Sequence, residues 1–557
     1  MSHGGMRRTG RPRIAALVIA AVLVLALAGA GAGYLLLRTK GSPRQTAAGY
    51  LADWQRGSYP AMARASVNAP RSGLAGPYRQ VAADLGLRQI HLSLGQVTVS
   101  GGSAQARFTA TASLASGHVW TYAGQLQLIR RDRGWLVDWS PAAIYPGLRA
   151  GERFAQRAAW PARAPVLAAD GTVLSSSQAA AKSGSLSLLT GEVAAATGAQ
   201  AKALGSPYRP GDQIGLGGVE QAYQNQLAGR PSLSILIEGP GGRLDATAAR
   251  FAATPGTPVR TSIDMQVQVA ASQAVRSAAT AKPVDMVAIQ PSTGRVLAVV
   301  ERPGGFDRAL QGEFPPGSTF KVLTASALAK SGLRPGSTVQ CPSQVNIGGR
   351  IFHNDNYEHY GSTSLQNAFA VSCNTTFAIA ATQRLGGPGL ASMAATFGFN
   401  SKPALGVPGE LGQFTTPHDS VDLAADAFGQ GTDLVNPLSQ ATVAAAIEDG
   451  TWRPPQLVIS PATRQAARPH ALSPPILDTL RPMMRAVVTS GTAANVGFPP
   501  GVYGKTGTAE YGGGPNPPSH AWFIGYRGDL AFAVLVEGGG LGASNAAPIA
   551  NAFLRHL

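Results

Sequence analysis

The sequence predicts a multidomain α+β protein that follows a single N-terminal membrane-spanning helix. Three observations support this fold class. The chain has 557 residues, which is too long for one ordinary hydrophobic core. An uninterrupted apolar run occupies residues 14–37. Beyond it, segments with the period-two alternation of half-buried strands are mixed with helical segments, both in residues 42–147 and in residues 256–557.

The apolar run is long enough to cross a bilayer. Residues 14–37 contain no charge and no proline, and a spanning helix needs only about 20 residues. Four arginines precede the run, so residues 1–13 are expected in the cytoplasm and everything after Lys40 outside. The alternative is a cleaved signal peptide, because residues 28–33 are rich in small side chains. The apolar run continues to residue 37, which favours a retained anchor.

The composition is that of a folded, basic protein. Hydrophobic residues make up 44% and charged residues 13% of the chain, and the net charge is +17. A nucleic-acid partner is not expected, because the basic residues are scattered and form no stripe interleaved with aromatics. A basic surface that faces an anionic membrane or polymer is the expected consequence of this charge.

Residues 42–147 are predicted to form a small α+β domain. Residues 47–65 have helical character, and four alternating segments follow at 90–99, 104–114, 119–130 and 135–139. A helix packed on a curved antiparallel sheet is the expected arrangement. No cluster of reactive side chains occurs there, so the domain is interpreted as a spacer or docking domain.

The rest of the chain divides into two parts. Residues 148–255 are irregular and predict an extended linker domain with short strands. Residues 256–557 are the best patterned. They predict a helix at 265–279, a hairpin formed by 284–289 and 295–300, helices until about residue 490, strands at 521–527 and 530–536, and a closing helix at 546–557. Strands at both ends with helices between them predict an antiparallel sheet with helices on its faces.

A serine and a lysine stand one helical turn apart in the first of three motifs. Ser318-Thr319-Phe320-Lys321 opens a helical segment that continues to Lys330. A serine hydroxyl is a poor nucleophile until a base takes its proton, and a lysine can be that base if burial and nearby positive charge lower its pKa. The pattern S-x-x-K alone is weak, because a helix cap followed by a surface lysine gives the same match.

Two further motifs contain polar side chains at turns and strand edges. Ser372-Cys373-Asn374 lies between helical segments at 363–371 and 375–385. Lys505-Thr506-Gly507-Thr508 precedes an alternating segment. On a strand edge Lys505 would attract a carboxylate, and Gly507 would allow close approach of the backbone to a ligand. Each motif alone is common.

The order S-x-x-K, S-x-N, K-T-G resembles the signature of penicillin-binding proteins and serine β-lactamases. The resemblance covers about residues 150–557. Residues 163–171 and 218–223 resemble the two linker motifs of class B penicillin-binding proteins, and residues 520–526 resemble their strand after K-T-G. Residues 42–147 resemble the NTF2-like N-terminal domain of the MecA-type subgroup. We find no glycosyltransferase segment, which favours class B.

The resemblance implies a role for each motif residue in acylation. Ser318 is the acylated nucleophile and Lys321 is its base. Ser372 relays a proton to the leaving amine, and Asn374 holds the substrate amide. The backbone N–H groups of Ser318 and Thr508 form the oxyanion hole.

The K-T-G motif is implied to bind the substrate. Lys505 is expected to be a catalytic residue. Together with Thr506 and Thr508 it is implied to bind the terminal carboxylate of the substrate. Gly507, between the two threonines, is implied to belong to the same substrate-binding strand. No metal or cofactor is expected. The histidines and carboxylates of residues 353–359 match no helix-borne zinc motif, so they are interpreted as a polar loop.

The implied substrate is a D-alanyl-D-alanine stem peptide of lipid II or nascent peptidoglycan, and β-lactams are implied to acylate the same serine. The resemblance also implies a SEDS-type glycosyltransferase partner and a catalytic domain outside the cell membrane. The alternatives are a penicillin-sensing or non-catalytic wall-binding protein, and a D,D-carboxypeptidase or β-lactamase.

The only two cysteines, Cys341 and Cys373, are both expected outside the cell. An oxidising exterior permits one disulfide between them. Against it, Cys373 lies inside the S-x-N motif, where a bridge would be expected to disturb its neighbours. One bridge and two free thiols therefore remain alternatives.

Overall fold

The computed structural model describes residues 41–557 apart from 133, 176–178, 180–184, 465–466 and 515. The predicted spanning helix at residues 14–37 lies outside this set. Among the described residues, no helix is both long and apolar enough to cross a bilayer. The described residues form two compact units, and the first comprises residues 41–160, apart from 133, together with 201–209 and 231–254.

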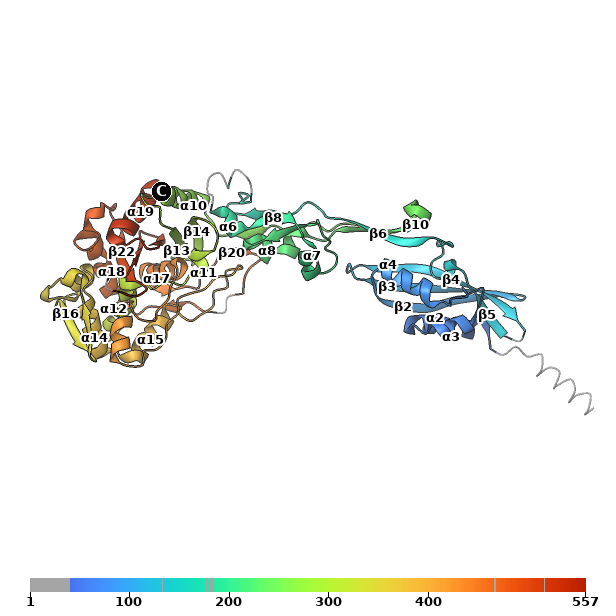
Figure 1. Ribbon diagram of the computed structural model, residues 1–557, viewed down its shortest axis with the longest axis horizontal. Coiled ribbons are helices and arrows are strands. Elements are labelled where there is room, and N and C mark those ends of the chain that lie inside the picture. Colours follow the sequence, from blue (N-terminus) through green and yellow to red (C-terminus); the bar gives the residue numbers. More distant parts are fainter. Residues whose placement is uncertain (1–40, 133, 176–178, 180–184, 465–466, 515) are drawn as a thin grey trace, which may run out of the picture. The chain divides into compact units, whose positions relative to one another are not determined.

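The first unit contains a five-stranded sheet covered by helices (Figure 1). Its strand order is β1 (Ser66–Val67), β5 (Gly134–Asp138), β4 (Val119–Arg131), β3 (Ser103–Leu114) and β2 (Leu87–Ser100). The helices are α2 (Pro43–Arg56), α3 (Tyr59–Arg64), α4 (Ala75–Asp84) and the short η1 (Pro141–Ala143). The predicted helix at 47–65 is therefore two helices. Gly57, at φ 71°, ends α2 in the left-handed conformation, and Pro60 lies in the first turn of α3.

The core of this sheet follows from strict alternation. Successive residues of β3 are alternately exposed and buried over most of its length. The rings of Trp54 and Phe108 meet edge to face at 5.9 Å. Gly124, opposite Phe108 on β4, leaves room for that ring, which a Cβ would overlap. The predicted helix on an antiparallel sheet is confirmed here.

Part of the predicted linker also belongs to the first unit. In it, β6 (Arg153–Ala159), β10 (Ser232–Glu238) and β11 (Leu244–Phe251) form a three-stranded antiparallel sheet, with η2 (Pro240–Gly242) between the last two. Its aliphatic side chains pack with those of the first sheet in a shared apolar cluster. α7 (Gly198–Leu204) contributes residues to both units.

The second unit is built around a five-stranded antiparallel sheet (Figure 1). Its strand order is β14 (Arg295–Arg302), β13 (Val284–Gln290), β24 (Ala531–Val536), β23 (Ser519–Tyr526) and β22 (Tyr503–Glu510). α17 (Pro437–Asp449) packs on β13, β23 and β24, while α10 (Met265–Arg276) and α19 (Gly542–His556) pack on the sheet and on each other. The predicted antiparallel sheet with helices on its faces is confirmed.

The remaining elements include strands that the sequence reading missed. Helices were predicted to dominate until residue 490, yet this stretch also contains the paired strands β15 (Thr338–Cys341) with β18 (Gly361–Ser364), β16 (Gln344–Ile347) with β17 (Arg350–His353), and β19 (Thr451–Trp452) with β21 (His470–Ala471). Its helices and turns are α11 (Arg308–Gln311), η3 (Gly317–Phe320), α12 (Lys321–Lys330), η4 (Asp355–Tyr357), α13 (Leu365–Ala370), α14 (Asn374–Arg384), α15 (Gly386–Thr396), α16 (Ser420–Asp426) and α18 (Pro474–Thr489). Near the linker and the C-terminus are α6 (Leu186–Thr190), α8 (Gly218–Ala222), α9 (Gln224–Ala228), η5 (Ala494–Val496), β7 (Val166–Leu167), β8 (Glu192–Ala195), β9 (Gln213–Leu216), β12 (Val259–Thr261) and β20 (Val458–Ser460).

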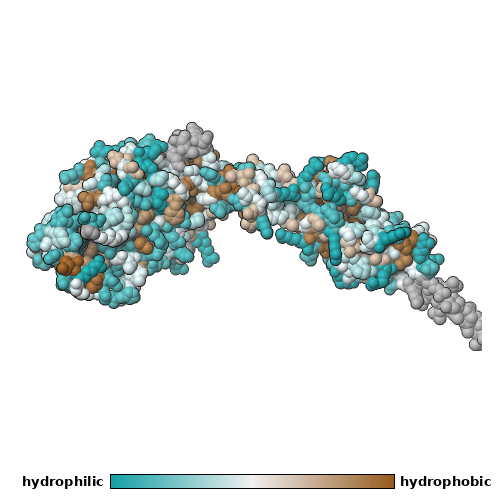
Figure 2. Space-filling view, viewed as in Figure 1, coloured by the Kyte–Doolittle hydropathy of each residue, from teal (hydrophilic) through white to brown (hydrophobic). Residues whose placement is uncertain are grey.

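Each unit has its own apolar core, and the cores share no buried residue. On the face shown in Figure 2, hydrophilic residues cover most of both units and apolar residues form only small patches. The cores are therefore internal to each unit. α12 is buried along nearly its whole length, so its first residues are held rigidly inside the second unit.

Candidate catalytic site

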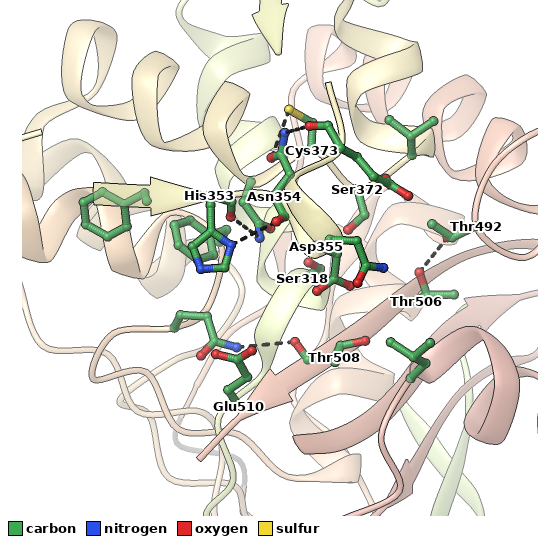
Figure 3. A pocket seen from close by; sticks show the side chains of 18 of the residues that line it. Ser318, His353, Asn354, Asp355, Ser372, Cys373, Thr492, Thr506, Thr508 and Glu510 are labelled. Atoms are coloured by element: carbon green, nitrogen blue, oxygen red, sulfur yellow. Dashed lines mark hydrogen bonds between the residues drawn. The ribbon is translucent and has the colours of Figure 1, made fainter. Parts of the chain in front are cut away.

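The three sequence motifs converge on one cavity of about 340 Å³ in the second unit (Figure 3). Ser318 comes from η3, Ser372 from the turn before α14, Asn374 from the first position of α14, and Thr506 and Thr508 from β22; all five line the cavity. The two motif lysines lie behind its wall and are fully buried. Residues separated by almost two hundred positions in the sequence thus form one site.

Glycine fixes the turn that carries Ser318. Gly317 has φ 54°, and a Cβ there would overlap the backbone of Thr508 on β22. Its N–H donates to the carbonyl of Gly429 at 2.9 Å. Ser318 was predicted to begin an α-helix; it lies instead in a 3₁₀ turn that leads directly into α12. The turn is thereby held between the sheet and the segment after α16.

The amine of Lys321 has four oxygen neighbours. Its Nζ lies 2.9 Å from Ser318 Oγ, 2.7 Å from the carbonyl oxygen of Ser372, 3.2 Å from Ser372 Oγ and 2.6 Å from Asn374 Oδ1. The carbonyl and the amide oxygen can only accept, so they take the two N–H groups of a neutral amine. The lone pair of that amine is then left for the hydroxyl proton of Ser318. This arrangement suits proton transfer from serine to lysine.

Burial gives Lys321 the protonation state that a base needs. Loss of hydration is the main cause that lowers the pKa of Lys321 well below its ordinary value, and the positive charge of Lys505 lowers it further. The carboxylate of Asp355 opposes both effects. Burial also lowers the pKa of Lys505, to about 7, again against the opposing effect of Asp355. Burial lowers the pKa of both lysines, and the charge of the other lysine is a further cause only for Lys321, which suits Lys321 to the role of the base.

The S-x-N turn links the two lysines. Lys505 Nζ donates to Ser372 Oγ at 2.9 Å, and it also donates to the carbonyl of Thr506 at 2.9 Å. Ser372 is left-handed at φ 64°, an uncommon conformation for a residue with a side chain. Of the two alternatives for the cysteines, the structure has the Cys341–Cys373 disulfide. The expected disturbance is not seen, because both neighbours of Cys373 still reach Lys321.

The threonines of β22 project alternately into the cavity. Thr506 Oγ1 lies 2.6 Å from Thr492 Oγ1, and the carbonyl of Thr508 accepts from Gln430 Nε2 at 3.3 Å. Gly507 does not line the cavity. A Cβ on Gly507 would lie 2.9 Å from Thr319 Cγ2, so its small size allows β22 to pack against the serine turn of its own chain. The predicted close approach of this backbone to a ligand stays a prediction.

Several lining residues were not identified from the sequence. Asp355, Gln430, Thr492 and Glu510 all contribute to the cavity wall. Asp355 belongs to the loop that was interpreted as merely polar, and it is the carboxylate that opposes the lowered pKa of both lysines. Gln430 could have been suspected as a site residue because it stands between two glycines, in Gly429-Gln430-Gly431, which is typical of a tight loop.

Comparison with known families finds three matches along the chain. Residues 285–555 match the penicillin binding protein transpeptidase domain, residues 42–152 match the NTF2-like N-terminal transpeptidase domain, and residues 173–261 match the penicillin-binding protein dimerisation domain.

Individual proteins are also similar to parts of this chain. The peptidoglycan D,D-transpeptidase PbpA of Mycolicibacterium smegmatis is 33% identical over 53% of this chain and 72% of its own length. PbpA of Mycobacterium tuberculosis is 32% identical over 48% of this chain and 66% of its own length. The fold is similar to that of PBP2 from Pseudomonas aeruginosa, with a TM-score of 0.59 at 24% identity, over 72% of this chain and 96% of the other.

Proposed function

Because the chain belongs to the penicillin-binding proteins and has their class B domain arrangement, we propose that it is a peptidoglycan D,D-transpeptidase with Ser318 as its nucleophile. One observation carries the assignment of the nucleophile. The buried amine of Lys321 lies 2.9 Å from Ser318 Oγ, and its other close contacts are oxygens that accept its N–H groups. Burial and a lowered pKa are what a lysine needs in order to take a proton from a serine hydroxyl.

In the proposed acylation, Ser318 Oγ attacks the carbonyl carbon of the penultimate D-alanine while its proton passes to Lys321 Nζ. The new bond is an ester, and the bond that breaks is the amide to the terminal D-alanine. Ser372 relays a proton to the departing amine, because its hydroxyl lies between Lys321 and Lys505. The N–H groups of Ser318 and Thr508 stabilise the oxyanion.

The terminal carboxylate is bound by the K-T-G strand. Lys505 supplies positive charge, and the hydroxyls of Thr506 and Thr508 face the same cavity. A carboxylate next to Lys505 raises the pKa of that lysine, so substrate binding itself keeps Lys505 charged while Lys321 stays neutral. A β-lactam also carries a carboxylate beside a reactive amide, so it acylates the same serine.

The second half of the reaction needs an acceptor amine. An amine of a neighbouring stem peptide attacks the ester, which releases Ser318 and forms the cross-link. In this assignment residues 256–557 carry the chemistry, while residues 42–147 and 148–255 serve as NTF2-like and dimerisation domains. Asn374 holds the backbone amide of the donor peptide.

We also propose that residues 14–37 retain the enzyme in the cell membrane with the catalytic domain outside. The uncharged apolar run after four arginines supports this orientation. N-terminal sequencing of the mature protein tests it, and a start near residue 33 would indicate cleavage instead. The family resemblance supports a SEDS-type glycosyltransferase as partner, which co-purification from membranes would detect.

Intact-mass spectrometry after incubation with penicillin tests the function. The wild-type protein should gain the mass of one penicillin, and Ser318→Ala should gain none because the attacking oxygen is gone. An adduct that persists in the alanine variant would show that another residue is acylated. Release of D-alanine from a synthetic stem peptide, with and without an acceptor amine, separates transpeptidation from carboxypeptidase activity.

A further inference from the structure

A buried asparagine that the proposed reaction does not use lies next to the S-x-N turn. Asn354 is only 3% exposed. Its Nδ2 donates to the carbonyls of Pro342 at 2.9 Å and Glu358 at 2.8 Å, and its Oδ1 accepts from the N–H of Thr375 at 3.0 Å. In the opposite orientation of the side-chain amide, its oxygen would face the two carbonyl oxygens and its NH₂ group would face the N–H of Thr375. The network therefore requires this amide in one orientation.

These hydrogen bonds fix the start of the helix that carries Asn374. Thr375 is the second residue of α14, where N–H groups have no acceptor within the helix. Asn354 supplies that acceptor from another segment of the chain. The carbonyl of the adjacent His353 accepts from Asn374 Nδ2 at 3.1 Å. Two consecutive residues thus hold both the backbone and the side chain at the start of α14.

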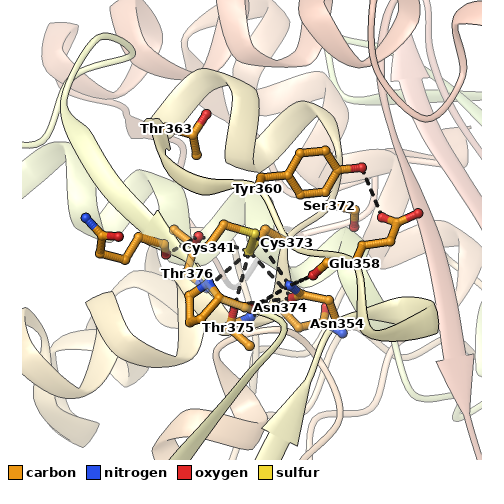
Figure 4. The surroundings of a disulfide bond; sticks show 12 residues. Cys341, Asn354, Glu358, Tyr360, Thr363, Ser372, Cys373, Asn374, Thr375 and Thr376 are labelled. Carbon is orange, nitrogen blue, oxygen red and sulfur yellow. Dashed lines mark hydrogen bonds between the residues drawn. A yellow bond between two sulfur atoms is a disulfide. The ribbon is translucent and has the colours of Figure 1, made fainter.

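The disulfide tethers the same turn next to Asn354 (Figure 4). Cys373 separates the two functional residues of the S-x-N motif and is bonded to Cys341 at the end of β15; both are buried. Thr376 Oγ1 donates to Cys373 Sγ at 3.0 Å. Asn354 Nδ2 lies 3.4 Å from Cys341 Sγ, so the amide and the disulfide are in direct contact.

The S-x-N turn needs such support because it holds two oxygen acceptors next to the amine of Lys321. Ser372 has a left-handed backbone, which a residue with a side chain keeps only where its surroundings impose it. The carbonyl of Ser372 and Oδ1 of Asn374 take the two N–H groups that direct the lone pair of Lys321 toward Ser318. A small displacement of this turn would misdirect that lone pair.

We propose that Asn354 and the Cys341–Cys373 disulfide form a clasp that positions the S-x-N turn against Lys321 and thereby sets the rate of acylation. The inference rests on the proposed function. Because the amide of Asn354 is occupied by backbone groups of Pro342, Glu358 and Thr375, Asn354 acts through the S-x-N turn and is a positioning residue.

A second buried asparagine offers a matched control. Asn436 is 1% exposed, and its Nδ2 donates to the carbonyls of Leu310 at 3.1 Å and Glu410 at 2.9 Å. Its Oδ1 accepts from the N–H of Ser439 in the first turn of α17 at 2.8 Å. The two side chains make the same kinds of bond, but among the described residues no hydrogen-bond partner of Asn436 belongs to the S-x-N turn.

The experiment compares Asn354→Ala with Asn436→Ala in the full chain. Acylation by a labelled penicillin is followed over a range of concentrations and pH, and thermal unfolding is recorded for each variant. We expect the first-order acylation constant of Asn354→Ala to fall by about 10-fold or more relative to the control, with a smaller change in the dissociation constant of the non-covalent complex.

The pH profile separates positioning from loss of stability. Oxygen acceptors favour the charged form of Lys321, so their displacement should move the acid limb of the acylation profile to lower pH in Asn354→Ala but not in Asn436→Ala. A folded Asn354→Ala protein with the wild-type acylation constant and an unmoved acid limb would overturn the proposal.

A second variant covers the case in which Asn354→Ala does not fold. The doubly substituted Cys341→Ser, Cys373→Ser protein should show the same slower acylation and the same shifted limb, and wild-type values for both would overturn the clasp. Failure of the wild-type protein itself to form an adduct would overturn the proposed function and this inference together. Normal wild-type acylation with unaffected variants overturns this inference alone.

Discussion

Two buried lysines contact the hydroxyl of Ser372, and their different surroundings predict different tolerance to substitution. Lys321 must lose its proton to accept one from Ser318, and an arginine cannot do so at any accessible pH. Lys505 must attract a carboxylate, which an arginine still does. We expect Lys321→Arg to lower the penicillin acylation rate by about 10²–10⁴-fold, the usual contribution of a general base. Lys505→Arg should keep a larger fraction of the activity.

The comparison requires that both arginine variants fold, because each site is fully buried and the side chain is longer. Circular dichroism and thermal unfolding provide this control. If Lys321→Arg acylates faster than Lys505→Arg, Lys321 is not the base, and the proposed proton transfer is wrong.

The carboxylate of Asp355 predicts a shift of the pH profile. It lines the cavity and counteracts the lowered pKa of both Lys321 and Lys505. Removing its charge in Asp355→Asn should lower both lysine pKa values further. Lys321 then becomes neutral, and Lys505 loses its charge, at lower pH than in the wild type. Both limbs of the acylation profile should therefore move toward acid.

Measurement of the acylation constant between about pH 5 and pH 10 checks this shift. Asp478→Asn, which removes an exposed carboxylate on α18, is the control and should leave both limbs in place. A profile of Asp355→Asn that superimposes on the wild type would show that Asp355 does not set the charge state of the lysines.

At the residue scale, the sequence predicts what is local and misses what is distant. Ser318 and Lys321 are three positions apart, so one helical turn brings them together whatever the rest of the fold does. Asn354 could not be predicted, because its three partners lie on separate segments and two of them are carbonyl groups. Every residue has a backbone carbonyl, so the residue type does not show which carbonyl accepts a hydrogen bond. The positive φ of Ser372 was equally hidden, since nothing about a serine demands it.

Individual helices and strands could be predicted where the apolar residues recur with one clear period along the sequence. β3 and β4 match the predicted strands at 104–114 and 119–130 closely, because their side chains alternate cleanly. The pairs β15 with β18 and β16 with β17 were missed. Each of these strands has only four residues, which is too short for a period-two pattern to stand out.

Two buried carboxyls, one at the end of α16 and one in the segment that follows it, predict a stability that depends on pH. Asp426 and Asp433 are each 1% exposed. Burial is the main cause that raises the pKa of Asp433 well above its ordinary value, and Asp426 raises it further. Neither oxygen of Asp433 accepts a hydrogen bond from an N–H or O–H group of a described residue, and we infer that the pair is satisfied by a proton shared between Asp433 and Asp426. The segment between them carries Gly429 and Gln430 to the catalytic site.

Folding retains a proton on Asp433 that the unfolded chain releases near its ordinary pKa of 3.8. Stability from this group is therefore fully present below that value and is lost as the pH rises toward the raised pKa of the folded state. The side chain in Asp433→Asn does not titrate, so this variant does not lose folding stability in this way as the pH rises. We expect it to raise the melting temperature at pH 7 and to flatten its pH dependence.

The control for this prediction is Asp449→Asn. Asp449 accepts from Arg453 at 2.8 Å and is partly exposed, so its replacement should lower the melting temperature slightly. A melting temperature of Asp433→Asn below that of the wild type at pH 7 and pH 8 would contradict the shared-proton interpretation.

On the scale of the whole molecule, two units with separate cores predict two unfolding transitions. The core of the first unit is built on its five-stranded sheet and that of the second on the catalytic sheet, and no buried residue belongs to both. A ligand that reacts with one native unit stabilises that unit alone. Penicillin bound to Ser318 should therefore raise one transition in differential scanning calorimetry and leave the other unchanged. Ser318→Ala should show no shift of either transition, whereas a single transition that moves as a whole would show that the two units unfold together.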